Sequence, residues 1–122
     1  MGQMKLPIFT ESYGLYKMIY NFRILVPRLD RYGLWLRTEN TTLDFIELII
    51  QAEAQYELEK LHTLNNASVK LNLLRFLVRI ACDVKAINIE KYNLLQQQIN
   101  SVGQMLGAWI KSIKNKNNIK AS

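Results

Sequence analysis

The pattern of apolar residues along this 122-residue chain is that of amphipathic helices. Apolar residues recur every three or four positions in its last third, which places them on one side of a helix. In LLRFLVRIACDV, Arg75 and Arg79 fall almost opposite a predicted core stripe of Leu73, Leu74, Leu77, Ile80, Ala81 and Val84. The stripe of YNLLQQQINSVGQMLGAWIKSI is Tyr92, Leu95, Ile99, Val102, Leu106, Ile110 and Ile113. Strand-like alternation is missing, so both segments are predicted helices.

The whole chain divides into four such helices. The first is expected over 10–26, since Thr10 or Ser12 can cap it and Pro27 disfavours helix at the preceding residue. The second is expected over 30–60, with 41 as an alternative start. The segment LHTLNNAS (61–68) is predicted as a loop, followed by a third helix that ends near 85. Asn88 opens the fourth, which ends near 114.

These elements predict an all-α, up-down-up-down four-helix bundle over 10–114, with an N-terminal extension (1–9) and a basic flexible tail (115–122). A chain of this length is expected to form one domain. It lacks the run of about 20 apolar residues that spans a bilayer. The absence of a signal-peptide core and the single cysteine, Cys82, favour a cytoplasmic protein without a membrane partner.

The net charge of +6 is distributed unevenly. Residues 39–60 carry one Lys and six acids, whereas 1–38 carry six Lys/Arg and two acids, and 61–122 carry nine and two. The segments on both sides of the acidic one are therefore basic, a pattern that suits an anionic partner such as nucleic acid.

Some apolar and aromatic residues exceed what a monomeric bundle can bury. The tyrosines of the first helix lie on a second face, and the run FIELII surrounds the next helix on more than one side. We therefore predict a homo-oligomer, since large exposed apolar area usually marks an interface. Two glycines inside the fourth helix allow close approach of a neighbouring helix, either within the chain or between subunits. The candidate interface residues are Tyr13, Tyr16, Tyr20, Phe45, Ile49, Gly103 and Gly107.

No catalytic constellation is visible in the sequence. His62 is the only histidine and falls in the predicted loop, Cys82 has no adjacent base, and no phosphate-binding glycine-rich loop is present. We therefore expect no catalytic residues, no metal site and no cofactor, and a protein that is not an enzyme.

Basic residues on faces that the predicted core does not use are the candidate functional residues. Arginine forks suit phosphate oxygens and stack on exposed bases. Ion pairs with the acids of the second helix, or a solvated helix end, are the alternative roles. The candidates for binding nucleic acid or a protein partner are Arg75, Arg79, Arg28, Arg31, Arg37, Lys111 and Lys114.

Three segments in this order carry a resemblance to a known family: PRLDRYGLWLRTENTTLDFIELIIQA, LRFLVRIACDV and KYNLLQQQINSVGQMLGAWIKS. Over about residues 13–114 the chain resembles the accessory variability determinant (Avd) proteins of diversity-generating retroelements. Gly33 and Trp35 depart from the polar and small residues expected there.

The resemblance implies a four-helix bundle that assembles as a five-subunit barrel with a basic surface. It implies binding to the retroelement's reverse transcriptase and its template RNA, with DNA or cDNA as a further ligand. Such a complex makes mutagenised cDNA, and the accessory protein is not itself the polymerase. On the matching positions, Arg75 and Arg79 are expected to contact the transcriptase or RNA, followed by Arg28, Arg31, Arg37 and Lys111.

Two alternatives remain open at this point. Proteins encoded by intervening sequences in 23S rRNA genes share the bundle, but they carry an Ile-Pro-Ser-Asn-Ile-Ala-Glu-Gly type segment where this chain has LRTENTTLDFIE. The other alternative is a purely structural homo-oligomer, whose charges serve solubility and subunit pairing.

Overall fold

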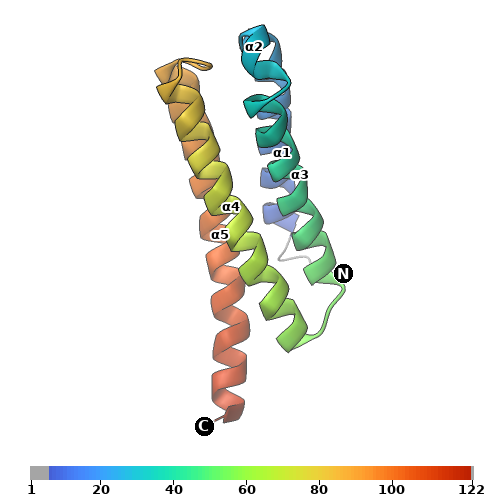
Figure 1. Cartoon of the computed structure of the whole chain (residues 1–122). Helices are drawn as coiled ribbons and strands as arrows, with labels where there is room; N and C mark the ends of the chain where they lie inside the picture. The colour runs from blue at the N-terminus through green and yellow to red at the C-terminus, as the bar shows by residue number, and fades with distance from the viewer. Residues whose placement is uncertain (1–5, 122) are drawn as a thin grey trace.

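The computed structural model describes the backbone of residues 6–121 and the side chains of 7–116. Over this range the chain forms four long helices, a short helix, and one 3-10 turn, without a strand (Figure 1). The long helices are α1 (Leu6–Phe22), α3 (Leu34–Glu53), α4 (Glu57–Asp83) and α5 (Ile89–Ala121). The turn η2 (Arg23–Leu25) and the short helix α2 (Arg28–Arg31) lie between α1 and α3. The predicted all-helical bundle is confirmed.

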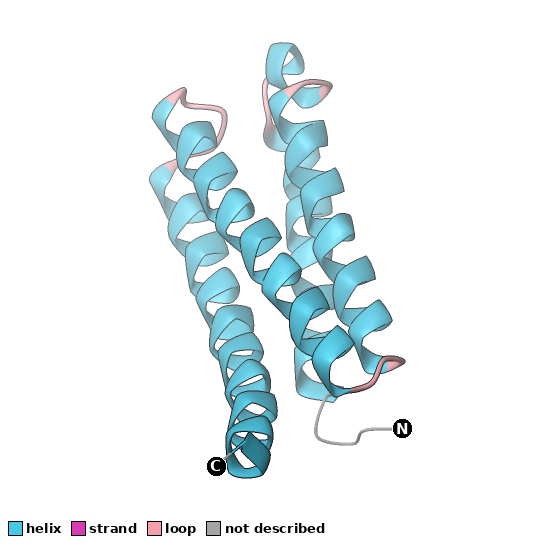
Figure 2. Ribbon diagram, turned by 60° about the horizontal axis from the view of Figure 1, so that its bottom comes forward, coloured by secondary structure: helices cyan, strands magenta, loops and turns pink. Residues whose placement is uncertain are grey.

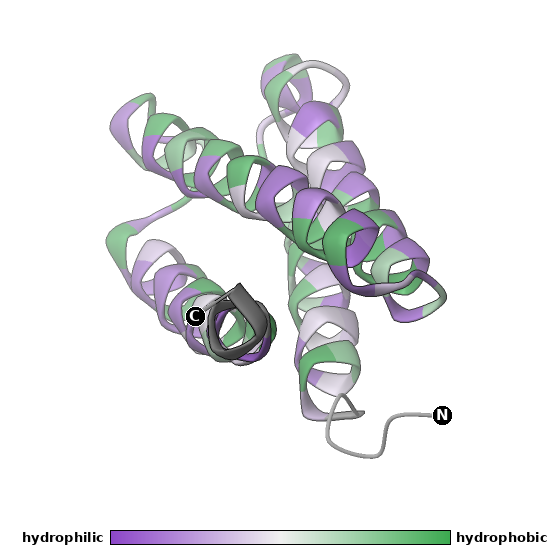
Figure 3. Cartoon of the chain, turned by 90° about the horizontal axis from the view of Figure 1, so that it is seen from below, coloured by the Kyte–Doolittle hydropathy of each residue, from purple (hydrophilic) through white to green (hydrophobic). Residues whose placement is uncertain are grey.

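The long helices enclose one core. Helices α1 and α4 each pack against both α3 and α5, and the connections lie at the two ends of the bundle (Figure 2). Hydrophobic and hydrophilic stretches alternate along every helix (Figure 3), as amphipathic helices require. Burial of one large apolar side chain contributes about 1.5–3 kcal/mol. The largest fully buried ones are Trp35, Phe45, Leu15, Ile19, Ile49, Leu64, Leu71, Leu74, Leu95, Ile99 and Leu106.

One proline and one glycine determine where α1 ends and where α3 begins. Val26 is extended (ψ 135°), the conformation that a following proline imposes, so α1 ends earlier than the predicted position 26. Gly33 separates α2 from α3, and Trp35 then enters the core with its Nε1 donating to the Ile19 carbonyl oxygen at 2.9 Å. The predicted helix 30–60 is therefore divided among three helices: the end of α2, the whole of α3, which ends at Glu53, and the first turn of α4.

The predicted loop at 61–68 was wrong. Those residues lie inside α4, and the chain turns between α3 and α4 at 54–56 instead. Leu64, Ala67 and Leu71 are buried at helical spacing, which continues the core stripe through the segment. Asn65 and Asn66 lie on the solvent side of that stripe, so these polar residues mark an exposed helix face and not a break.

The connection between α4 and α5 is a helix C-terminal motif. Ala86 N–H donates to the Ala81 oxygen at 2.8 Å and Lys85 N–H donates to the Cys82 oxygen at 3.0 Å. This geometry puts Lys85 in the left-handed region (φ 66°). Asn88 Oδ1 then accepts from Lys91 N–H at 2.9 Å, which confirms that Asn88 opens the last helix.

Helix α5 runs past its expected end at 114, as far as Ala121. The flexibility of the basic tail stays a prediction, and the side chains of 117–122, like residues 1–5 of the predicted extension, lie outside the described residues. Within the described chain, no helix is both long and apolar enough to cross a membrane.

Helix α4 is apolar on two faces. The predicted core stripe is correct for Leu74, Leu77 and Ala81, which are buried, but Val84 is 55% exposed. Val78, which was not predicted, is fully buried. The core face is therefore rotated relative to the predicted stripe and centred on Leu71, Leu74, Val78 and Ala81.

Candidate partner and nucleic-acid interface

The sequence suggested that Arg75 points directly away from the core. In the structure it lies against α5 instead. Its guanidinium covers Gly103, where an added Cβ would stand 2.6 Å from Arg75 Nη2. Arg75 Nη1 donates to Asn72 Oδ1 at 2.8 Å, and Gln96 Nε2 donates to the Arg75 carbonyl oxygen at 3.2 Å. Gly103 thus makes room for this arginine within the chain, and the guanidinium has a fixed place in the seam between α4 and α5.

Arg79 stands one turn further along α4 and is exposed. It pairs with Asp83 on its own helix at 3.4 Å, and the negative charge of Asp83 raises the pKa of Arg79 above its ordinary value. Both side chains are more than 60% exposed, and such a pair contributes little to stability. Arg79 therefore pairs with an acid of its own helix and not with the acids of the second predicted helix, and its guanidinium stays accessible to an anionic ligand.

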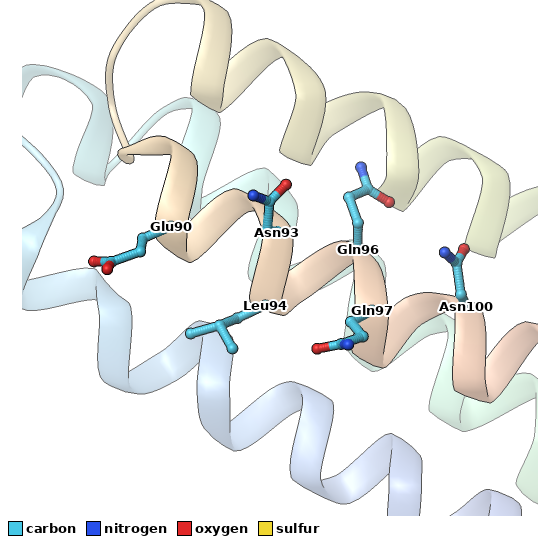
Figure 4. Close-up of a pocket in the computed structure, with 6 residues that line it drawn as sticks. All are labelled: Glu90, Asn93, Leu94, Gln96, Gln97 and Asn100. Atoms are coloured by element: carbon cyan, nitrogen blue, oxygen red, sulfur yellow. The ribbon is translucent and has the colours of Figure 1, made fainter.

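The outer face of α5 carries carboxamides. Asn93, Gln96, Gln97 and Asn100, together with Glu90 and Leu94, line a groove of about 580 Å³. Figure 4 shows the amides spread over successive turns of α5, with Gln96 and Asn100 on the side toward α4. Each carboxamide offers both donors and an acceptor. This face can therefore bind a polar surface without adding charge.

The C-terminal half of α5 continues this face with exposed cations. Lys111 and Lys114 are exposed, whereas Lys116 pairs with Glu57 at 3.4 Å. Gly107 is exposed too, and a Cβ there would meet nothing within 4 Å. Nothing within the described chain explains this glycine, in contrast to Gly103.

The three candidate arginines near the junction of the first two predicted helices, Arg28, Arg31 and Arg37, have different roles. Arg31 is half-buried and donates from Nη2 to the carbonyl oxygens of Val26, at 3.0 Å, and Ile24, at 3.3 Å, so it holds the turn together. Arg28 and Arg37 are exposed, with no ion pair to another described residue. Only these two offer a free cationic head.

Arg23 was not among the predicted site residues. It forms a two-point ion pair with Glu39: Nε to Oε2 at 2.8 Å and Nη2 to Oε1 at 2.9 Å. The hydrogen bond to Glu39 raises the pKa of Arg23 above its ordinary value. Glu39 is 2% exposed and lies on the acidic segment, so the charge imbalance between segments was the only sequence signal for this pair.

The tyrosines of α1 lie toward solvent, as predicted. Tyr13 and Tyr20 are 62% and 51% exposed, and Tyr16 is half-buried beside Tyr20 with ring centroids 6.2 Å apart. Lys17 lies 4.9 Å from the centre of the Tyr13 ring, and Arg23 lies 5.0 Å from that of Tyr20. This face of α1 and η2 therefore carries both aromatic rings and cations.

Phe45 and Ile49 were wrongly assigned to a subunit interface. Both are fully buried within the single chain, so they have no surface to offer a second copy. The exposed apolar residues of α3 lie on another face and repeat every seven positions: Leu36, Leu43 and Ile50. On α4 the exposed Val69 and Phe76 repeat in the same way, with the half-buried Leu73 and Ile80 between and beyond them. Sequence periodicity contained both stripes, but it did not show which face points outward.

Groups that could perform chemistry are scattered. In the part of the chain that the structure describes, no three His, Cys, Asp or Glu side chains gather where they could hold a metal ion. His62 is exposed on α4, and Cys82 is half-buried against the core. The surface features that stand out are therefore cations, amides and apolar stripes.

This arrangement of four helices, with exposed cations on α4 and α5, agrees with the comparison with known families. A model of the bAvd-like family matches residues 8–113. The chain belongs to the bAvd-like family. The match covers α2, α3 and α4 and most of α1 and α5, which confirms the resemblance found in the sequence. Membership of the bAvd-like family indicates an accessory protein of the Avd type. A search of curated proteins finds no match.

Proposed function

We propose that this protein is the accessory subunit of a diversity-generating retroelement. It is a cytoplasmic, non-catalytic adaptor that binds the reverse transcriptase and its template RNA and supports mutagenic cDNA synthesis. The observation that carries the proposal is the bAvd-like match over residues 8–113 of a basic bundle. The exposed cations on α4 and α5 and at the α2–α3 junction agree with it.

The proposed mechanism of RNA binding is electrostatic. Arg79, Lys111 and Lys114 are exposed on two adjacent helices, and Arg75 lies in the seam between them. Cations on such a surface neutralise phosphates and release counterions, which makes the affinity fall steeply with salt. The amides of α5 between these cations supply hydrogen bonds to sugar and base edges. The surface thereby holds the template close to the polymerase without performing chemistry on it.

The proposed active form is a homo-oligomer, a five-subunit barrel by resemblance to Avd proteins. Its support in this chain is the two exposed apolar stripes, one on α3 and one on α4. Apolar residues at alternating spacings of four and three, as on α4, form the seam of helix-to-helix association. A contact between two different stripes closes into a ring when its rotation allows. Five copies would bring five sets of the basic residues onto one particle and so raise the effective concentration of binding sites.

The test is an affinity purification of the tagged protein from its host at moderate salt, with proteins identified by mass spectrometry and RNAs by sequencing. A reverse transcriptase with one enriched RNA supports the proposal. Ribosomal components would favour the protein class encoded by 23S rRNA intervening sequences. Recovery of the protein alone would favour a purely structural homo-oligomer, an alternative that the exposed apolar stripes also support.

Two charge-reversal variants test which face of the protein binds the transcriptase or RNA. Arg75→Glu with Arg79→Glu should abolish recovery of the transcriptase or RNA, while Lys17→Glu with Lys60→Glu, the same change in net charge elsewhere, should retain it. Equal losses in the two variants would show that net charge alone matters. Unchanged binding in the arginine variant would place the interface on another face.

A further inference from the structure

A groove at the junction of α1, η2 and α2 has no role in the surfaces described so far. It has a volume of about 380 Å³. Tyr20 and Tyr32 belong to its lining and are 51% and 72% exposed, so two aromatic rings at one groove are open to solvent. The complete lining is Tyr20, Asn21, Arg23, Ile24, Arg31 and Tyr32.

Hydrogen bonds within the chain hold both arginines of this groove. Arg23 is fixed at two points by Glu39, and its guanidinium carbon lies 5.0 Å from the centre of the Tyr20 ring. Arg31 is fixed by the carbonyl oxygens of Ile24 and Val26. The groove is therefore formed before any ligand arrives, and little side-chain ordering opposes binding at its base.

This lining fits an unpaired nucleobase together with its phosphate. Exposed tyrosine rings provide stacking surfaces for bases of any sequence. The carboxamide of Asn21 can both donate and accept at a base edge. Arg28 is exposed on α2, the same short helix that supplies Arg31, and can pair with a phosphate. The positive charge of helix α2 favours an anionic ligand over an apolar peptide in this groove.

We propose that this groove, the Tyr20–Tyr32 groove, binds an unpaired base of single-stranded RNA by stacking on its tyrosines. The inference rests on the proposed RNA-binding function and adds to it a site that distinguishes single-stranded from paired RNA. The bases of a duplex are stacked on one another and cannot enter such a site.

The test measures binding of the full-length protein to a short labelled single-stranded oligoribonucleotide and to its duplex, over a range of salt concentrations. The variants are Tyr32→Ala, which removes the ring, and Tyr32→Phe, which retains it. Tyr56→Ala is the matched control, since Tyr56 is 87% exposed on the α3–α4 connection, away from the groove.

Tyr32→Ala should weaken single-strand binding roughly 5- to 150-fold, the range that corresponds to the loss of one base–aromatic stack. The slope of log affinity against log salt should not change, because stacking releases no counterions. Duplex binding should stay as in the wild type. Tyr32→Phe and Tyr56→Ala should both bind the single strand as the wild type does.

Four outcomes would overturn the inference. If the wild type binds and Tyr32→Ala equals Tyr56→Ala, RNA binds elsewhere, and only the groove assignment fails. If Tyr32→Ala weakens binding of the single strand and the duplex alike, the ring contributes to a general RNA-binding surface and does not stack on an unpaired base. If it changes the oligomeric state, the ring contacts a second copy of the chain. If the wild type binds neither RNA, the proposed RNA-binding function fails with it.

Discussion

The guanidinium of Arg75 on α4 covers Gly103 on α5, with Nη2 2.6 Å from the position that a Cβ would take. The two residues are 28 positions apart in sequence, yet the side chain of one occupies the space that the other leaves. Gly107, one turn later on α5, has no such neighbour within the chain. The two glycines therefore make a natural pair for separating a packing role from a role in partner contact.

Gly103→Ala should displace Arg75 without unfolding the bundle. The group that must move is the end of a flexible side chain, and alanine favours a helix interior over glycine by about 1 kcal/mol. We expect a free energy of unfolding, measured by urea titration, equal to or above the wild type. Binding of the transcriptase or RNA should weaken, because the guanidinium has left its place. Normal binding with normal stability would show that the position of Arg75 is unimportant.

Gly107→Ala is the companion variant. An added Cβ meets nothing within 4 Å in the chain, so the variant should gain up to about 1 kcal/mol of stability. If a partner approaches α5 closely at this point, the same methyl group should weaken that contact. Urea titration of the isolated protein and a binding assay separate the two effects. Higher stability with unchanged assembly and binding would leave the glycine without a function in contact.

The Arg23–Glu39 pair should behave asymmetrically on mutation. Arg23→Met leaves a carboxylate that is 2% exposed without its partner, and we expect a melting temperature roughly 10 °C lower. In the double variant Arg23→Met with Glu39→Met no buried charge remains, so much of the loss should be recovered. Thermal unfolding of the two variants and of Glu39→Met completes the cycle. A double variant that is less stable than Arg23→Met would contradict this account.

Sequence periodicity was sufficient for the fold because the core stripes of α1 and α5 are single. Leu15 and Ile19 on α1 are spaced four positions apart and are buried, and Leu95 and Ile99 on α5 are buried as predicted. Sequence periodicity was insufficient for α4, because apolar residues occupy two of its faces. Only packing against α3 and α5 decides which face turns inward. The same ambiguity assigned Asn65 and Asn66 to a loop, since polar residues on an exposed face resemble a break.

The candidate site was predictable as a set of residue types and not as a geometry. Arg79, Lys111 and Lys114 are exposed as expected, because each lies outside the core stripe of its helix. Arg31 could not be recognised as a turn-stabilising residue, since its acceptors are carbonyl oxygens placed by η2. Residues separated by 16 positions, such as Arg23 and Glu39, pair only once the helices are in place.

Lys85→Gly should stabilise the protein. Lys85 has φ of 66° in the turn after α4, a left-handed conformation that costs a residue with a side chain about 1 kcal/mol and costs glycine little. We expect a gain of about 0.5–1 kcal/mol in urea titration, with the hydrogen bonds of the turn retained. Val84→Gly is the control, since Val84 lies next to it with φ of −88° and should lose stability. A loss in both variants would mean that the lysine side chain contributes contacts in the turn.

Phe76→Ser tests whether the apolar stripe of α4 joins subunits. Phe76 is 64% exposed in the single chain, so its replacement should leave the fold of the monomer, followed by circular dichroism, unchanged. Light scattering after size-exclusion chromatography should show the assembly shifted to smaller species, because a seven-residue apolar seam loses its largest side chain. Ile89→Ser is the matched control, since Ile89 is similarly exposed, at 61%, but lies at the start of α5 outside the stripe.

Equal assembly in the two variants would remove this stripe from the interface and leave the stripe of Leu36, Leu43 and Ile50 on α3 as the one to test. Dissociation of the Phe76 variant together with loss of RNA binding would show that the basic residues act as an array, since each chain keeps its own arginines and lysines.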